Sequence, residues 1–351
     1  MSTPSLPQFA LEDLADPDGL GLDSSEQQRR RELVQLRSQT SLDQDINKKR
    51  GHGVEIFGQT IDVHEEIRLL RVHLCRESQD QSPPIECSLE EVNRFASKVP
   101  WTRARYIALS YEWDPAYEQE HIADIYINKK PFSVRRNLFT FLHTMRQAKN
   151  EGPFWIDAIC INQLDKEEKA TQLQLMPQIY QKASLVIFWL RTDSTSVSLA
   201  SFDFETCHQK LELMMQESRK PTAILDYDDR ELVSAYTWII THSYWYRLWI
   251  IQEFLLADKV EIHTGPVHWT LSELQYLRAV YVYMAKQHRE DGRDIPEAKD
   301  TCHKKNHSLH EVIHRWCEHD CSEPHDKVYG LIGLVSSHRI IADYNKSLDD
   351  L

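Results

Sequence analysis

Three short apolar segments, each too short to be a typical buried helix, constrain the fold of this chain most strongly. They are YIALSYEW at residues 106–113, FWIDAICI at residues 154–161 and SLVIFWL at residues 184–190. Short apolar runs flanked by turn-forming residues are typical of buried strands. Apolar side chains at helical spacing separate them, over residues 137–148 and 169–183. This alternation predicts an α/β fold with a mostly parallel central sheet flanked by helices.

Further elements are expected on both sides of this central pattern. We predict a strand at residues 67–74, a short helix at residues 89–98 and a hairpin at residues 122–134 that turns at Asn128-Lys129-Lys130. A second strand signal lies at residues 259–265. Helical insertions are expected from residue 230 and over residues 271–287, 308–317 and 326–335.

The chain divides by composition into a tail and a folded region. Residues 1–55 are polar and rich in Ser, Asp, Gln and Arg, which predicts a disordered tail. Residues 56–351 contain the apolar patterns and are expected to form the folded domain.

Charge and hydropathy limit the partners. The 351 residues have a formal net charge of −13, so binding to nucleic acid or to an anionic membrane is not expected. The longest apolar run is about six residues, far short of a membrane span, and the N-terminus has no signal-peptide pattern. Several of the seven cysteines lie in apolar runs, as reduced thiols do, which predicts a cytoplasmic protein.

Two carboxylates in apolar segments are the main candidates for a catalytic site. Asp157 lies within FWIDAICI and Glu253 within LWIIQEFLLA, where an ionised side chain must be paired, neutralised or directed into a cleft. Arg247 is the nearest cationic candidate in sequence. The alternative is a structural ion pair that joins strand to helix, because such pairs also perturb pKa values without catalysis.

Other polar and aromatic residues could bind a substrate beside these charges. Tyr111 and Trp113 end the first buried strand, where they could stack on a planar group or simply belong to the core. The amide side chains of Asn162, Gln163 and Gln252 follow Asp157 or adjoin Glu253.

A separate pattern, His310-Glu311-Val312-Ile313-His314, has the H-E-x-x-H spacing of zinc proteases. The spacing places both imidazoles on one helix face, so His310 and His314 are candidate metal ligands. With 17 histidines in the chain, however, this spacing can arise by chance. We therefore expect a solvated polar helix face and no metal cofactor.

Several of these blocks together resemble the HET (heterokaryon incompatibility) domain of filamentous fungi. The matching blocks are IRLL, YIALSYEW, the long segment at residues 154–190, YWYRLWIIQE at residues 244–253 and DKVYGLIGL at residues 326–334. The resemblance extends over about residues 60–345. Family members commonly continue beyond the equivalent of Leu351, so we expect either a fragment truncated at its C-terminal end or a short member of the family.

The resemblance implies a module of fungal nonself recognition that triggers programmed cell death. It also implies a distant similarity to TIR-like folds, some of which cleave NAD, so NAD or another nucleotide is a candidate substrate rather than a cofactor. Under this hypothesis Glu253, Asp157 and Arg247 form the catalytic site of a glycohydrolase, and protein partners or self-association activate it. The alternatives are a non-enzymatic homotypic interaction module and a zinc hydrolase at His310 and His314.

Overall fold

The computed structural model describes most of the chain between residues 56 and 347. The described residues are 56–57, 66–74, 83–93, 105–113, 122–192, 203–216, 230–287, 309–316, 319, 321, 324–335 and 346–347. The predicted tail, residues 1–55, therefore lies outside the described residues. The chain forms two compact units, one built mainly from residues 34–189, 247–260 and 306–351, and the other from residues 190–246 and 261–305. We call them the sheet unit and the helical unit and describe each by itself.

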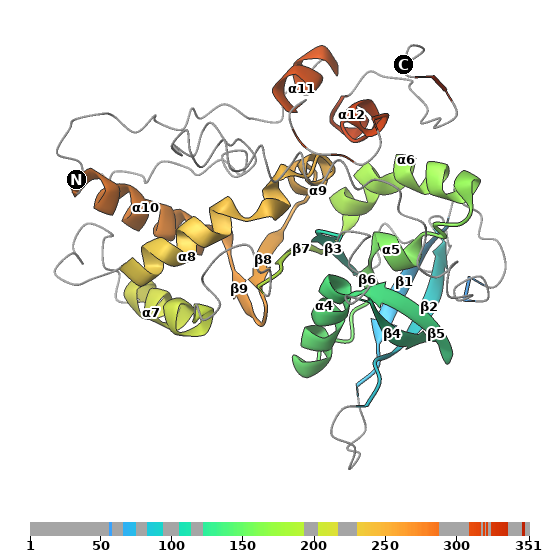
Figure 1. Ribbon diagram of the computed structural model, residues 1–351, viewed down its shortest axis with the longest axis horizontal. Coiled ribbons are helices and arrows are strands. Elements are labelled where there is room, and N and C mark those ends of the chain that lie inside the picture. The colour runs from blue at the N-terminus through green and yellow to red at the C-terminus, as the bar shows by residue number, and fades with distance from the viewer. Residues whose placement is uncertain are drawn as a thin grey trace. The chain divides into compact units, whose positions relative to one another are not determined.

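The sheet unit contains a mixed sheet with the strand order β5-β4-β2-β1-β6-β3-β7 (Figure 1). At its centre β3 pairs in parallel with both β6 and β7, whereas the β1–β2 and β4–β5 pairs are antiparallel. The α/β fold with a parallel central sheet is thus confirmed. The strands are β1 (Glu66–Val72), β2 (Glu86–Asn93), β3 (Ile107–Tyr111), β4 (Ile122–Ile127), β5 (Lys130–Arg135), β6 (Phe154–Trp155) and β7 (Leu185–Leu190).

Two of the predicted elements are wrong. Residues 154–161 were expected to form one strand, but β6 ends at Trp155 and Asp157–Cys160 form the one-turn helix α5. Residues 89–93 of the expected helix at residues 89–98 belong instead to β2, which pairs with the whole of β1, and residues 94–98 lie outside the described residues. In both segments the apolar pattern was too short to separate strand from helix, and tertiary pairing decided the outcome.

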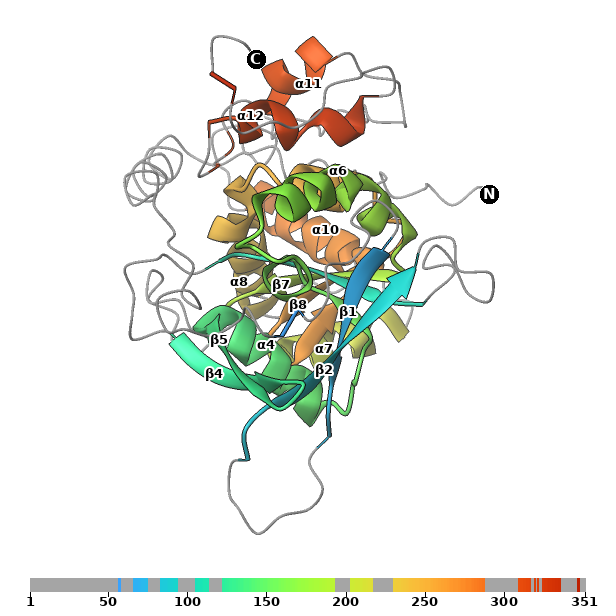
Figure 2. The ribbon, with the colours of Figure 1, turned by 90° about the vertical axis from the view of Figure 1, so that its right-hand side faces the viewer.

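Alternating side chains of β3 face two different helical layers. Leu109 and Tyr111 belong to the apolar cluster that includes Phe141 of α4 (Arg136–Gln147). Tyr106, on the opposite alternation, donates from its hydroxyl to the Ile179 carbonyl of α6 (Lys166–Lys182), at 2.6 Å. Figures 1 and 2 show α4 and α6 on different sides of this part of the sheet. Because side chains alternate along a strand, Ser110 shares the face of Tyr106.

The C-terminal elements of the sheet unit pack beside α6. Helix α9 (Ile250–Leu255) contacts α6, and the short helix η5 (Ile332–Leu334) contacts both. Helices α11 (Leu309–Trp316) and α12 (Asp326–Tyr329) also contact η5. The long apolar helix expected at residues 326–335 is thus divided into α12 and η5.

The helical unit contains three longer helices and a hairpin. They are α7 (Phe204–Gln216), α8 (Arg230–Thr241) and α10 (Leu271–Gln287), with η4 (Ser243–Tyr246), and strands β8 (Val260–Thr264) and β9 (Val267–Trp269). Helix α8 packs against both α7 and α10, and α7 contacts β9. The predicted strand at residues 259–265 and helix at residues 271–287 are confirmed.

Candidate functional site

Glu253 is a buried carboxylate on the face of the sheet that α6 and α9 cover. Its residue is only 2% exposed, and Ser110 Oγ donates a hydrogen bond to its Oε2. Tyr180 of α6 provides another side-chain hydrogen bond. Burial raises the pKa of Glu253 from 4.5 to about 7, although the nearby charge of Arg247 acts in the opposite direction. A carboxyl group with this pKa exchanges its proton near neutral pH, as an acid–base group requires.

Arg247 binds the end of β3 and interacts electrostatically with both carboxylates. Its Nη1 donates to the Tyr111 carbonyl oxygen at 2.5 Å, at the carboxyl end of the strand. Its positive charge lowers the pKa of both Asp157 and Glu253 and is the largest of the opposing influences on each. The guanidinium therefore links the two acids electrostatically.

Asp157 begins α5, directly after the carboxyl end of β6. Its Oδ1 accepts hydrogen bonds from the Ala158 amide at 2.7 Å and from Trp113 Nε1 at 3.3 Å. Burial raises the pKa of Asp157, against the charge of Arg247 and these hydrogen bonds. Parallel strands place their carboxyl ends at one edge of a sheet, where ligands commonly bind in α/β proteins. The structure thus places the predicted pair, Asp157 and Glu253, around one arginine.

The predicted aromatic residues occupy different positions. Half-buried Trp113 contacts Asp157 through its indole N–H, and the guanidinium of Arg135 lies 5.7 Å from its ring centroid. Tyr111 is 3% exposed and belongs to the apolar cluster on the α4 side. The side chain of Tyr111 is therefore on the other strand alternation from Ser110, which binds Glu253.

The three predicted amide side chains are also separated. Gln163 Nε2 donates to the Asp157 carbonyl at 2.9 Å, which ties the α5–α6 turn to the site. Gln252 is buried, and its Nε2 donates to the Tyr329 carbonyl at 3.2 Å. This hydrogen bond connects α9 to α12. Asn162 lines an open depression of about 440 Å³, together with Leu164, Asp165, Lys166 and Glu167.

Sequence reasoning missed Ser110 and Tyr180. Ser110 is the one small polar side chain within β3, and that was the available signal. A buried ion pair was also missed: Arg68 Nη1 lies 2.5 Å from Glu168 Oε1, and both side chains are at most 2% exposed. This pair joins β1 to α6 and is a structural ion pair of the kind considered for Asp157 and Glu253.

His310 and His314 lie on the exposed face of α11, with their ring centroids 6.2 Å apart. Among the residues that the structure describes, no third His, Cys, Asp or Glu joins them in a metal-binding group. The predicted zinc site at His310 and His314 therefore has no third ligand among the described residues.

Within the same described residues, none of the helices is both long and apolar enough to cross a membrane.

Comparisons with known proteins agree with the resemblance expected from the motifs. Residues 106–253 match the family model described as Heterokaryon incompatibility protein (HET). Heterokaryon incompatibility protein 6, OR allele, of Neurospora crassa is 30% identical over 235 residues, covering 57% of this chain and 33% of that protein. The chain thus spans about a third of the length of this curated relative. No solved structure matches the chain.

The matched segment begins at Tyr106 and ends at Glu253, so it contains Asp157, Arg247 and Glu253. The framework that carries the family pattern is therefore also the framework that assembles the candidate site. These findings agree with the expected resemblance: residues 106–253 of this chain are similar to the heterokaryon incompatibility (HET) domain.

Proposed function

We propose that this domain is an effector of fungal heterokaryon incompatibility that cleaves the glycosidic bond of NAD or a related nucleotide. The observation that carries the proposal is the buried Glu253, whose pKa is raised to about 7. Its carboxyl group interacts electrostatically with Arg247 and Asp157. The family match supports a role in incompatibility. A protein partner or self-association would activate the domain, and cell death would follow from loss of the nucleotide.

Glu253 has the chemistry needed at the ribose. When the bond to nicotinamide breaks, positive charge develops on the ribose, and an ionised carboxylate stabilises that charge best where water is excluded. Ser110 donates to Glu253, and the Tyr180 hydroxyl, which donates to the Leu109 carbonyl at 3.1 Å, also interacts with it. Water then adds to the ribose carbon and releases one proton, which a carboxylate with a pKa near 7 can accept.

The remaining residues would bind and orient the nucleotide. Trp113 offers a half-buried ring near Asp157, and Asp157 could accept hydrogen bonds from ribose hydroxyls. Arg247 balances the charge of the two acids and is held at the strand end by the Tyr111 carbonyl. Each role depends on side chains that come from separate segments of the chain.

The test is NAD hydrolysis by the purified chain, with product analysis at concentrations that include self-associating conditions. We expect Glu253→Gln to lower the rate about 10²–10³-fold, as removal of one electrostatic stabiliser does. Glu90→Gln, which removes a carboxylate from an exposed pair with Arg71, is the matched control and should retain activity. Thermal melts of all three proteins separate loss of chemistry from loss of fold.

Two results together would overturn the proposal. One is that the wild-type chain leaves NAD and other nucleotides intact even when it self-associates. The other is that Glu253→Gln causes cell death as efficiently as wild type. A non-enzymatic interaction module would then account for the incompatibility role, and Glu253 would serve the fold alone.

A further inference from the structure

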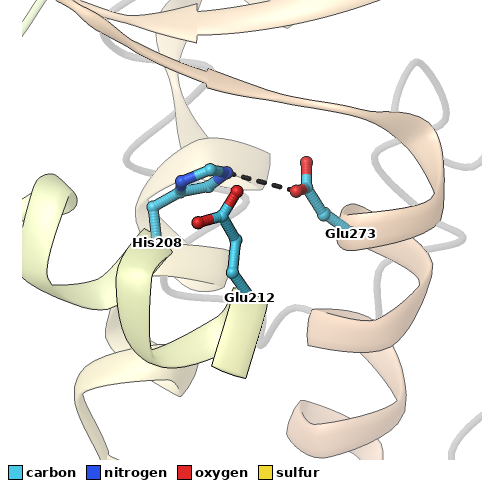
Figure 3. A group of neighbouring side chains, drawn as sticks. All are labelled: His208, Glu212 and Glu273. Atoms are coloured by element: carbon cyan, nitrogen blue, oxygen red, sulfur yellow. Dashed lines mark hydrogen bonds and ion pairs between the residues drawn. The ribbon is translucent and has the colours of Figure 1, made fainter. Parts of the chain in front are cut away.

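A cluster of potential metal ligands lies in the helical unit, outside the site described above. His208, Glu212 and Glu273 bring one imidazole nitrogen and two carboxylate oxygens within 4.8 Å of one another (Figure 3). His208 Nε2 lies 3.2 Å from Glu273 Oε1. Their side chains are only 14% and 13% exposed, whereas Glu212 is exposed.

Local structure explains why these ligands converge. His208 and Glu212 are four residues apart on α7, so they share one helix face. Glu273 lies in the first turn of α10, where its Oε2 accepts hydrogen bonds from the amide and hydroxyl of Thr270, at 2.6 and 2.8 Å. This capping arrangement fixes the carboxylate and leaves Oε1 directed at His208.

The distances fit a small divalent cation. Zinc binds nitrogen and oxygen ligands at about 2.0–2.2 Å in tetrahedral geometry, which places neighbouring ligand atoms about 3.3 Å apart. The observed 3.2 Å between His208 Nε2 and Glu273 Oε1 is close to that spacing. Exposed Glu212 can complete the set through a small side-chain rotation. Calcium, which takes six to eight oxygen ligands, fits this donor set poorly.

The surroundings hold the imidazole in place. The ring of His208 packs edge-on against Trp269, with centroids 5.0 Å apart. The exposed His268 on β9 has its ring centroid 6.0 Å from that of His208. His268 is not among the residues whose ligand atoms lie within 4.8 Å of one another, so water can occupy the fourth position of a tetrahedral ion.

We propose that His208, Glu212 and Glu273 bind a zinc-type divalent ion that ties α7 to α10. The ion replaces the direct His208–Glu273 hydrogen bond and neutralises two carboxylates in a chain of net charge −13. Its role is structural: it stabilises the helical unit, and it takes no part in the chemistry proposed for Glu253. The competing explanation is an ordinary His208–Glu273 pair beside a solvated Glu212.

The test uses the full chain, purified without a histidine tag, stripped with chelator and titrated with zinc chloride in a calorimeter. We expect one zinc per chain and a melting temperature that rises as zinc is added. Glu212→Gln should weaken zinc binding at least tenfold. Glu205→Gln, an exposed change of the same charge on the same helix, is the matched control and should bind zinc as wild type does.

Comparison of the two variants decides the result, because other histidines and cysteines could bind zinc elsewhere. Equal zinc affinity in Glu212→Gln and Glu205→Gln would overturn the proposal, as would the absence of zinc binding by the wild-type chain. His208→Asn provides a second check, since it too should weaken binding without changing Glu212.

Discussion

Replacement of Glu253 by Gln should change how the stability of the protein depends on pH. The folded state binds a proton at Glu253 more tightly than the unfolded state, because burial raises the pKa from 4.5 to about 7. The resulting stabilisation is fully present below about pH 4.5 and is lost as the pH rises through 7. Wild type should therefore lose stability relative to Glu253→Gln across this range.

The size of the effect follows from the displacement of the pKa. Each pH unit of displacement corresponds to about 1.4 kcal/mol, so the full effect is about 3 kcal/mol. Most of it should develop between about pH 5 and pH 8. This is a sizeable part of the free energy of unfolding of an ordinary domain, which is about 5–15 kcal/mol.

Urea unfolding at a series of pH values and constant salt measures this difference. The relevant quantity is the free energy of unfolding of wild type minus that of Glu253→Gln, because titration of other groups largely cancels. Glu90→Gln, which removes a carboxylate from an exposed pair, is the control and is measured at the same pH values. A flat or rising difference for Glu253→Gln would refute the reasoning and show that Glu253 is ionised in the fold.

Two further predictions concern the framework. Arg68→Met should destabilise the protein by about 3–5 kcal/mol, because it leaves the buried Glu168 charge uncompensated, whereas Arg71→Met in the exposed pair should cost at most about 1 kcal/mol. Equal urea midpoints for the two variants would contradict this. Lys129→Gly should stabilise the hairpin by about 0.5–1 kcal/mol, since Lys129 has a φ of 67°, and a lower melting temperature would count against it.

Local sequence was sufficient where the structure depends on short-range geometry. Of the turn predicted at Asn128-Lys129-Lys130, Asn128 and Lys129 are confirmed with φ values of 51° and 67°, whereas Lys130 begins β5. The helix at Leu271–Gln287 was also predicted with its bounds. Both depend on residues close together in the chain, which is why pattern and turn chemistry identify them.

The errors occurred where distant segments decide the structure. The segment Glu86–Asn93 became a strand because β1 pairs with it, for example through Leu70 and Leu89. The chain leaves the sheet after Trp155 and starts a helix at Asp157, although the apolar run continues. A run of this length does not distinguish a strand from a buried helical turn.

The same division applies to the candidate site. The sequence alone determined which charges are unusual, because Asp157 and Glu253 interrupt apolar segments. Only the tertiary structure decided that Ser110 and Tyr180 bind Glu253, that Arg247 influences both acids, and that Tyr111 turns toward the other face. The physical reason is that the neighbouring residues in the sequence show where a charge would be buried at a cost in free energy. The groups that offset this cost come from remote segments of the chain.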